Sequence, residues 1–217
     1  MKKRKGKGKG DDWEKKLAEE AETETAREKG KAGGGGNKIS IKGRRFTFDG
    51  EVLGKTLKGV ILDFRYERAY YKKKFKDDAG DTPTCFALSD DGEEMKPHKN
   101  SPSIQARTCE KCPHSKWGSG KGRAQACGDR RRFAIISADD LDSVEDVEEA
   151  DIALVSVPPT SVRKWVKYIK DLKEQNSRSP HRVVTTLSFD KESEYTMLEF
   201  ELEEKLERDI AEAVEER

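Results

Sequence analysis

The feature that most constrains this chain is a long segment, residues 95–129, that has neither helical nor strand periodicity and few large apolar side chains. A loop of this length inside a compact domain needs its own means of holding a shape. Three cysteines lie in it with the spacing Cys109-x2-Cys112-x14-Cys127, and Cys85 lies in the preceding strand candidate. Four thiolates at about 2.3 Å from one Zn²⁺ form a closed structural site. We therefore predict a structural zinc ion bound by these four cysteines, which replaces an apolar core in the loop.

The cysteine pattern has competing interpretations. His98 and His114 are alternative fourth ligands if Cys85 is an ordinary buried thiol. A redox Cys-x-x-Cys pair needs a thioredoxin-like βαβ setting, which the predicted elements do not provide. A phosphate-binding loop needs G-x-x-x-x-G-K-[ST], and Ser115 stands where its first glycine should be. The H-x-E and P-C-x-x-C motifs of zinc deaminases do not occur in the sequence.

The distribution of charge bounds the class of protein. Of the 217 residues, 33% are hydrophobic and 40% are charged, which predicts long solvated segments around a modest core. The net charge of +1 conceals a basic start, MKKRKGKGKG, and a mostly acidic end, EFELEEKLERDIAEAVEER. A basic arm attracts nucleic acid, and an acidic tail is typical of protein interaction.

Hydropathy predicts no membrane association. No apolar stretch approaches the roughly 20 residues of a membrane span, and no apolar core follows the basic start as in a secretory signal. We therefore expect a soluble, cytoplasmic protein. In a reducing compartment its four cysteines favour metal binding over disulfides.

Composition divides the chain into three regions. Residues 1–37 are a basic, flexible N-terminal arm with a marginal helix and a glycine linker, residues 38–200 are the folded domain with the zinc loop at about 85–130, and residues 201–217 are an acidic C-terminal helix or tail. β-Branched and aromatic residues between turn signals predict strands within 39–54, 57–75, 82–92, 130–140 and 151–159, and a hairpin over 181–202 that turns at 190–193.

Two helices follow from the 3.6-residue period. The internal helix, 160–175, can be capped by Thr160 or Ser161, and its apolar stripe is Val162, Trp165, Val166, Ile169 and Leu172. The closing helix carries Leu202, Leu206, Ile210 and Val214. Together the elements predict a mainly β fold: an OB-fold-like Greek-key barrel with an inserted zinc-binding loop, one internal helix and a C-terminal acidic helix. A β-sandwich is the alternative.

Aromatic and basic side chains are mixed at high density in RYERAYYKKKFK, residues 65–76. Adjacent residues of a strand face opposite ways, so at least one of two neighbouring tyrosines should be exposed. Exposed rings among cations are typical of single-stranded nucleic-acid sites, where each stacked base contributes about 1–3 kcal/mol. The competing interpretation is a solvated hairpin with tyrosines as apolar cover. The predicted nucleic-acid contacts are Arg44, Arg45, Arg65, Tyr66, Arg68, Tyr70, Tyr71, Lys72, Lys73, Lys74, Phe75, Lys116, Trp117, Arg130, Arg131 and Arg132.

The order of these motifs resembles a group of bacteriophage single-stranded DNA-binding proteins. The resemblance covers roughly residues 44–202 and rests on FRYERAYYKKKF, TPTCFALSDDG, TCEKCPHSKWGSGKGRAQACGDRRRFAII, VRKWVKYIKDL and HRVVTTLSF…YTMLEFEL. In plan the chain is similar to the T4-type helix-destabilising proteins, in which a zinc-bearing loop is inserted into an OB barrel. That family uses one histidine and three cysteines, whereas this chain offers four cysteines in a different order. The resemblance implies coating of single strands during phage DNA replication, recombination and repair in the host cytoplasm.

We therefore expect a non-enzymatic protein that binds single-stranded DNA without sequence preference, by stacking bases and neutralising phosphates. Its acidic C-terminus is expected to contact replication or recombination proteins. The alternatives are a zinc-ribbon RNA-binding or transcription factor and a structural or assembly protein that does not bind DNA. A nuclease with Asp139, Asp140 and Asp142 as metal ligands is a further alternative, although that segment is more simply a solvated acidic turn and helix.

Overall fold

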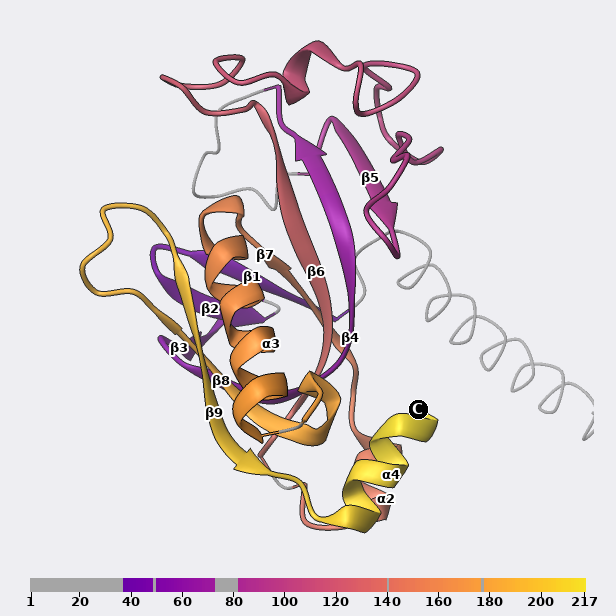
Figure 1. Ribbon diagram of the computed structural model, residues 1–217, viewed down its shortest axis with the longest axis vertical. Coiled ribbons are helices and arrows are strands. Elements are labelled where there is room, and N and C mark those ends of the chain that lie inside the picture. Colours follow the sequence, from indigo (N-terminus) through magenta and orange to yellow (C-terminus); the bar gives the residue numbers. More distant parts are fainter. Residues whose placement is uncertain (1–36, 49, 73–81, 140, 177) are drawn as a thin grey trace, which may run out of the picture. The chain divides into compact units, whose positions relative to one another are not determined.

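A single curled sheet dominates the computed structural model, which describes residues 37–48, 50–72, 82–139, 141–176 and 178–217 (Figure 1). Within these ranges the sheet has nine strands: eight follow the order β3-β2-β1-β7-β6-β4-β8-β9, and β5 pairs with β4 beside this path. The β1–β7 pair is parallel and the other neighbours are antiparallel. The strands are β1 (Lys38–Lys42), β2 (Arg45–Phe48), β3 (Glu51–Gly54), β4 (Leu57–Tyr70), β5 (Cys85–Ser89), β6 (Cys127–Ser137), β7 (Ala153–Val157), β8 (Val183–Phe189) and β9 (Leu198–Lys205). The predicted mainly β class is confirmed.

The long antiparallel pair β4–β6 forms the centre of the sheet. Its register runs from Gly59 opposite Ser137 to Tyr70 opposite Cys127. β4 is rich in Val, Ile, Phe and Tyr, the residues that suit a half-buried pleated surface. At Gly59 an added Cβ would lie 2.4 Å from the carbonyl oxygen of Ile136. Only glycine therefore allows the two strands to pass so closely at this position.

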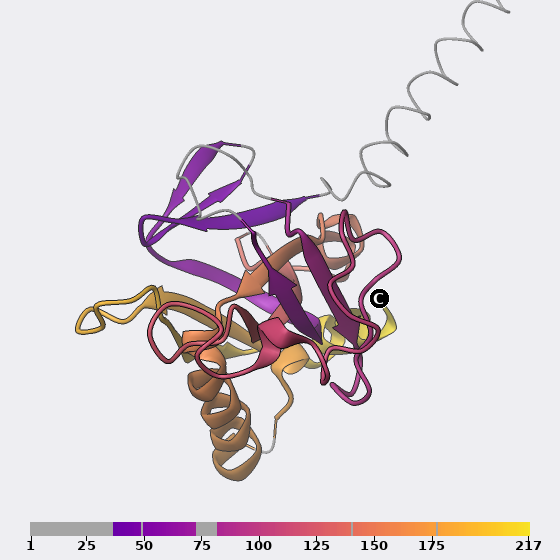
Figure 2. The ribbon, with the colours of Figure 1, turned by 90° about the horizontal axis from the view of Figure 1, so that it is seen from above.

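The sheet curls into a half-barrel. Phe46 of β2 and Phe189 of β8 have four strands between them in the sheet order, yet their ring centroids are 4.8 Å apart. Seen from above, strands β1–β3 and helix α3 (Val162–Asn176) lie at opposite sides of the view, with the β8–β9 hairpin between them (Figure 2). This curl brings the β1–β2 turn close to the tip of the β8–β9 hairpin.

The main core lies between the inner face of the sheet and α3. Trp165 of α3 is fully buried against Phe133 of β6, with 4.4 Å between ring centroids, and Phe64 and Phe200 pack on the same indole. The predicted apolar stripe of α3 is wrong at one position, since Val166 is 54% exposed. Tyr168 is buried in its place, because its hydroxyl forms a 2.8 Å hydrogen bond with Thr185 Oγ1.

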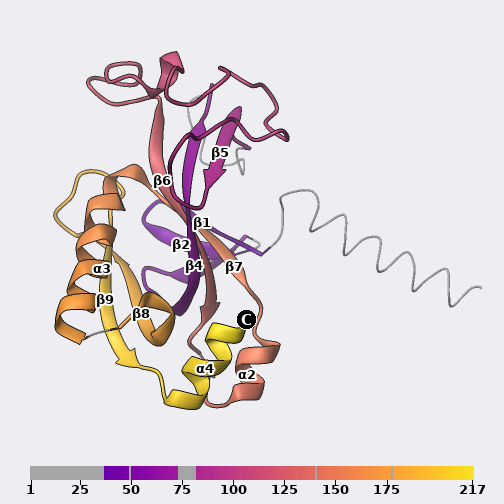
Figure 3. The same ribbon diagram turned by 45° about the vertical axis from the view of Figure 1, so that its right-hand side comes forward.

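A second apolar cluster covers the other face at one end of the sheet. Helices α2 (Val144–Glu149) and α4 (Arg208–Glu216) pack there through Val147, Ile210 and Val214. Ser143 caps α2, because its hydroxyl accepts a hydrogen bond from the amide of Asp146. The long β5–β6 loop lies beyond the opposite end of the sheet (Figure 3).

Several elements begin or end at other residues than the sequence predicts. The second strand of the hairpin, predicted to end at residue 202, continues as β9 to Lys205, so α4 begins only at Arg208 and not near residue 201. Asn37, predicted in the N-terminal arm, already joins the sheet, since its carbonyl accepts a 2.7 Å hydrogen bond from the amide of Leu154. The rest of that arm lies outside the described residues.

The 3-10 turns are η1 (Pro113–Ser115), η2 (Pro159–Ser161) and η3 (Pro180–Arg182). Among the described helices none has the length and apolarity needed to span a membrane.

Candidate nucleic-acid interface and cysteine cluster

The register of β4 and β6 separates the predicted binding residues onto two faces. Opposed residues of an antiparallel pair lie on the same face. Tyr66 is opposite Arg131 and Arg68 is opposite Asp129, so these side chains share the face on which α3 packs. Arg65 is opposite Arg132 and Glu67 is opposite Arg130, so these belong to the other face. The predicted residues therefore do not form one continuous surface.

On the α3 face, the end of the sheet brings the cysteines together. Tyr70 is paired with Cys85 on one side and with Cys127 on the other. The β5–β6 loop folds over this end, held by a 2.9 Å hydrogen bond from the Cys109 amide to the Met95 carbonyl. All four thiols, including Cys112, are buried and reduced, and they line one cavity of about 10 Å³. That volume suits one water-sized occupant.

Without a bound cation, the cavity favours protonated thiols over thiolates. Burial, with a further contribution from the neighbouring thiols, raises the pKa of Cys127 to about 12. Burial also raises the pKa of Cys109, and Arg68 acts against both shifts. Arg68 is held in place by a 2.7 Å ion pair with Asp129 and a 3.3 Å hydrogen bond to Ser115 Oγ. As the described side chains stand, no group of three or more His, Cys, Asp or Glu is set to hold a metal ion.

Both candidate histidine ligands are engaged elsewhere. The imidazole of His114 stacks on Tyr70 with 3.8 Å between centroids, and its Nε2 lies 3.3 Å from Gln105 Oε1. His98 stacks on Phe86, and its Nδ1 accepts a hydrogen bond from the amide of Asn100. Neither histidine is among the described residues that line the cysteine cavity. This arrangement favours Cys85 over either histidine as the fourth residue of the cysteine cluster.

A groove opens on the sheet where β1 separates from β7. The parallel ladder has only the pairs Lys38–Leu154 and Ile39–Val155, and beyond them the strands diverge. The resulting cavity is about 290 Å³. Its described lining contains three cations, Lys38, Lys42 and Arg130, and no acidic residue. The other described lining residues are Ile39, Ser40, Ile41, Tyr71, Ser156, Pro158 and Thr196.

The charges beneath this groove are partly compensated. Glu67 is only 3% exposed and accepts hydrogen bonds from Arg132 and from Ser156 Oγ, so Arg132 is committed to it. Burial lowers the pKa of Lys38, although Glu67 opposes that shift. The guanidinium of Arg130 lies 5.6 Å from the centroid of the Tyr71 ring, and its buried Nε has no hydrogen-bond partner. Lys42 and Arg130 therefore leave positive charge at the groove that Glu67 does not neutralise.

Other predicted contacts are engaged within the protein. Arg65 forms an ion pair of 3.0 Å with Asp90, and Arg131 lies 3.9 Å above the Tyr66 ring. Arg44 donates to two carbonyls of the β8–β9 hairpin. Among the described residues the exposed members of the predicted set are Arg45, Arg65, Lys72, Lys116 and Trp117, and Trp117 is 79% exposed. Lys73, Lys74 and Phe75 lie outside the described residues.

Sequence reasoning missed Lys38, Lys42, Ser156 and Thr196 as groove residues. The segment KISIK does contain a signal, because its polar residues alternate with Ile39 and Ile41 and so place both lysines on one face. Ser156 and Thr196 carry no comparable local signal, since only the curl of the sheet brings them to β1.

Comparisons of the chain with protein-family models, curated proteins and solved structures found no match in any of the three.

Proposed function

We propose that this protein binds single-stranded DNA without sequence preference and does not catalyse a reaction. The observation that carries the proposal is the groove beside β1, lined by Lys38, Lys42 and Arg130 without a facing carboxylate in its described lining. Cations of this kind bind phosphates and release their counterions. The guanidinium of Arg130 lines the groove beside the Tyr71 ring, where it would pair with a phosphate.

Two aromatic side chains supply the second part of the proposed mechanism. Tyr71 lines the groove, and Trp117 presents an exposed ring on the β5–β6 loop. Bases of a single strand stack on such rings, whereas the bases of a duplex are stacked on one another and do not offer their faces. Stacking discriminates weakly between bases, so we expect little sequence preference. The curled half-barrel supports an OB-like interpretation of the fold, in which such a strand lies across the sheet.

We further propose that Cys85, Cys109, Cys112 and Cys127 bind a structural Zn²⁺. The proposal is supported by four thiols around one cavity of a single atom's size and by the adjacent positive charge of Arg68. A divalent cation there would reverse the raised thiol pKa values, because it stabilises thiolates. The thiols would need to rotate toward a common point, after which the ion would hold the β5–β6 loop against the end of β4.

The deciding experiment is a salt titration of the full chain binding to a fluorescent single-stranded DNA oligonucleotide. Unlabelled single-stranded DNA, duplex DNA and single-stranded RNA serve as competitors. We expect log K to fall linearly with log salt, and single-stranded DNA to compete best. A preference for RNA or for a duplex sequence would support a zinc-ribbon RNA-binding or transcription factor instead. Absence of salt-dependent binding would support a structural or assembly role.

A further inference from the structure

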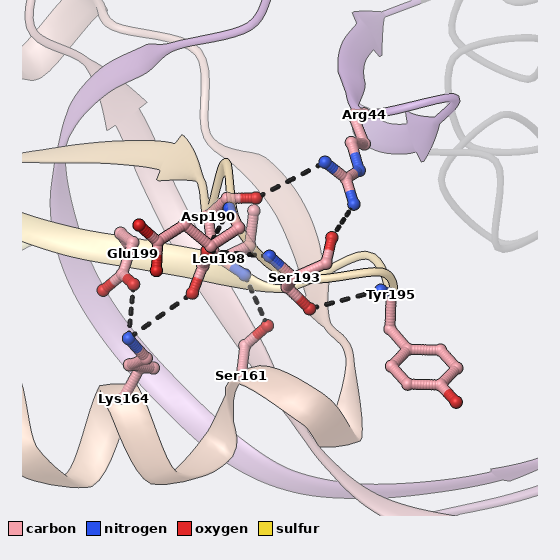
Figure 4. Close-up of polar contacts among 9 residues, drawn as sticks. Arg44, Ser161, Lys164, Asp190, Ser193, Tyr195, Leu198 and Glu199 are labelled. Atoms are coloured by element: carbon pink, nitrogen blue, oxygen red, sulfur yellow. Dashed lines mark hydrogen bonds and ion pairs between the residues drawn. The ribbon is translucent and has the colours of Figure 1, made fainter.

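The tip of the β8–β9 hairpin, residues 190–197, is held by contacts to two other elements (Figure 4). Asp190 closes the turn, since its Oδ1 accepts from the amides of Glu192 and Ser193 at 2.9 and 3.1 Å. From α3, Lys164 pairs with Asp190 and Glu199. Ser161 Oγ accepts a 2.7 Å hydrogen bond from the amide of Leu198, the first residue of β9. The hairpin tip is therefore fixed on the side of the helix.

Arg44 fixes the hairpin tip from the opposite side. Gly43 and Arg44 are the two loop residues between β1 and β2, and both have positive φ, +54° and +58°. Such a turn favours glycine, asparagine or aspartate, so an arginine in it carries a conformational cost. Its guanidinium donates to the carbonyls of Asp190 and Ser193 (Figure 4). These two bonds give Arg44 a positioning role, in place of the nucleic-acid contact predicted from sequence.

The fixed hairpin carries an exposed ring on Tyr195, the residue that precedes the groove residue Thr196. Tyr195 is 68% exposed, and its side chain extends away from the polar contacts that hold the tip. Its neighbour Thr196 lines the groove with Lys38, Lys42 and Arg130, and the Thr196 carbonyl accepts a hydrogen bond from Thr160. The amide of Tyr195 donates to Ser193 Oγ, so its backbone is held as well. A ring on a fixed backbone loses little conformational entropy on binding.

We propose that the β8–β9 hairpin is the second wall of the DNA groove, that Tyr195 stacks on a base there, and that Arg44 positions the hairpin for this contact. This inference rests on the proposed single-stranded DNA binding. It deepens that proposal, because it adds a stacking residue that the sequence did not single out and removes Arg44 from the phosphate contacts.

The test compares Tyr195→Ala, Tyr195→Phe and the wild type in the same salt titration. Loss of the ring should weaken binding by between about fivefold and a hundredfold without changing the salt slope, and phenylalanine should retain near wild-type affinity. Tyr195 is exposed, so thermal unfolding of both variants should match the wild type. If the wild type binds but Tyr195→Ala binds equally well, this inference is wrong while the proposed function stands. If the wild type shows no salt-dependent binding, the proposed function fails and this inference fails with it.

Arg44→Gly and Arg44→Lys test the positioning role. Glycine relieves the positive-φ cost, so Arg44→Gly should not lower the melting temperature, yet it should weaken DNA binding and speed trypsin cleavage after Lys191 in the hairpin. Lysine keeps the charge but has one donor nitrogen in place of the planar fork whose two nitrogens reach the two carbonyls, so Arg44→Lys should not restore affinity. Full affinity in Arg44→Lys, together with a reduced salt slope in Arg44→Gly, would show that Arg44 contacts phosphate and would overturn its assigned role.

Discussion

Tyr70 and His114 stack with 3.8 Å between ring centroids and 11° between ring planes. The contact joins the end of β4 to η1 of the β5–β6 loop, between Cys85 and Cys127 in the sheet register. One face of the Tyr70 ring is therefore occupied within the protein. Tyr70 belongs to the support of the cysteine cluster, and the Tyr71 ring, on the next residue, lines the cationic groove.

Tyr70→Ala should destabilise the β5–β6 loop more than it weakens DNA binding. The lost ring pair contributes about 0.5–1.5 kcal/mol beyond its buried area. The measurement is chemical unfolding together with oligonucleotide titration, and Tyr71→Ala is the matched control with the opposite pattern expected. Equal stability of Tyr70→Ala and the wild type, with a large loss of DNA affinity, would contradict this assignment.

Cys112→Ser should lower the bound zinc and loosen the loop, since a structural site with three remaining thiolates binds the ion far more weakly. Metal analysis of the purified protein measures the stoichiometry, expected near one ion per chain in the wild type. Lys121→Gln, at an exposed position of the same loop, is the control that should keep its metal. Metal-free wild-type protein with a protease-resistant loop would count against the site.

The metal-free protein should lose stability as pH rises above about 9. The pKa of Cys127 is about 12 in the folded state against 9.0 for the ordinary thiol, so the unfolded chain releases this proton first. The contribution is present in full below pH 9 and disappears as pH approaches about 12. Zinc-loaded protein should behave in the opposite sense, because protonation of thiolates at acid pH releases the ion. Unfolding curves against pH, with and without a chelator, distinguish the two.

Lys42→Gln and Arg130→Gln should each weaken DNA binding and reduce the magnitude of the salt slope by about 0.7, the value for one phosphate contact on a single strand. Lys170→Gln is the control, because Lys170 lies on α3 and pairs with Glu174 rather than facing the groove. An unchanged slope in both groove variants would place the DNA elsewhere on the protein.

Glu67→Gln should destabilise the fold by about 1–3 kcal/mol, because Arg132 and Ser156 lose a charged acceptor that is almost fully buried. Asp90→Asn breaks the solvent-exposed pair with Arg65 and should change stability little. Urea unfolding of both variants makes the comparison. Similar stabilities would mean that Arg132 does not depend on Glu67.

The sequence by itself determined most of the secondary structure and the identity of the cysteine set. The burial of Trp165 and Leu172 in α3 and the start of the hairpin turn at Asp190 follow local periodicity and turn chemistry, although the hairpin loop extends to residue 197 and not only to 193. The spacing of Cys109, Cys112 and Cys127 likewise pointed to one cluster, and all three line one cavity with Cys85.

Only the tertiary structure decided which faces these residues occupy. The pairing of β4 with β6 places Arg130 in the groove and Arg131 above Tyr66, although they are neighbours in the chain. Arg44 resembles a phosphate contact in sequence, but the curl of the sheet brings its guanidinium to the Ser193 carbonyl, 149 residues away. Strand register and sheet curvature depend on contacts far apart in the chain, and local composition carries no information about them.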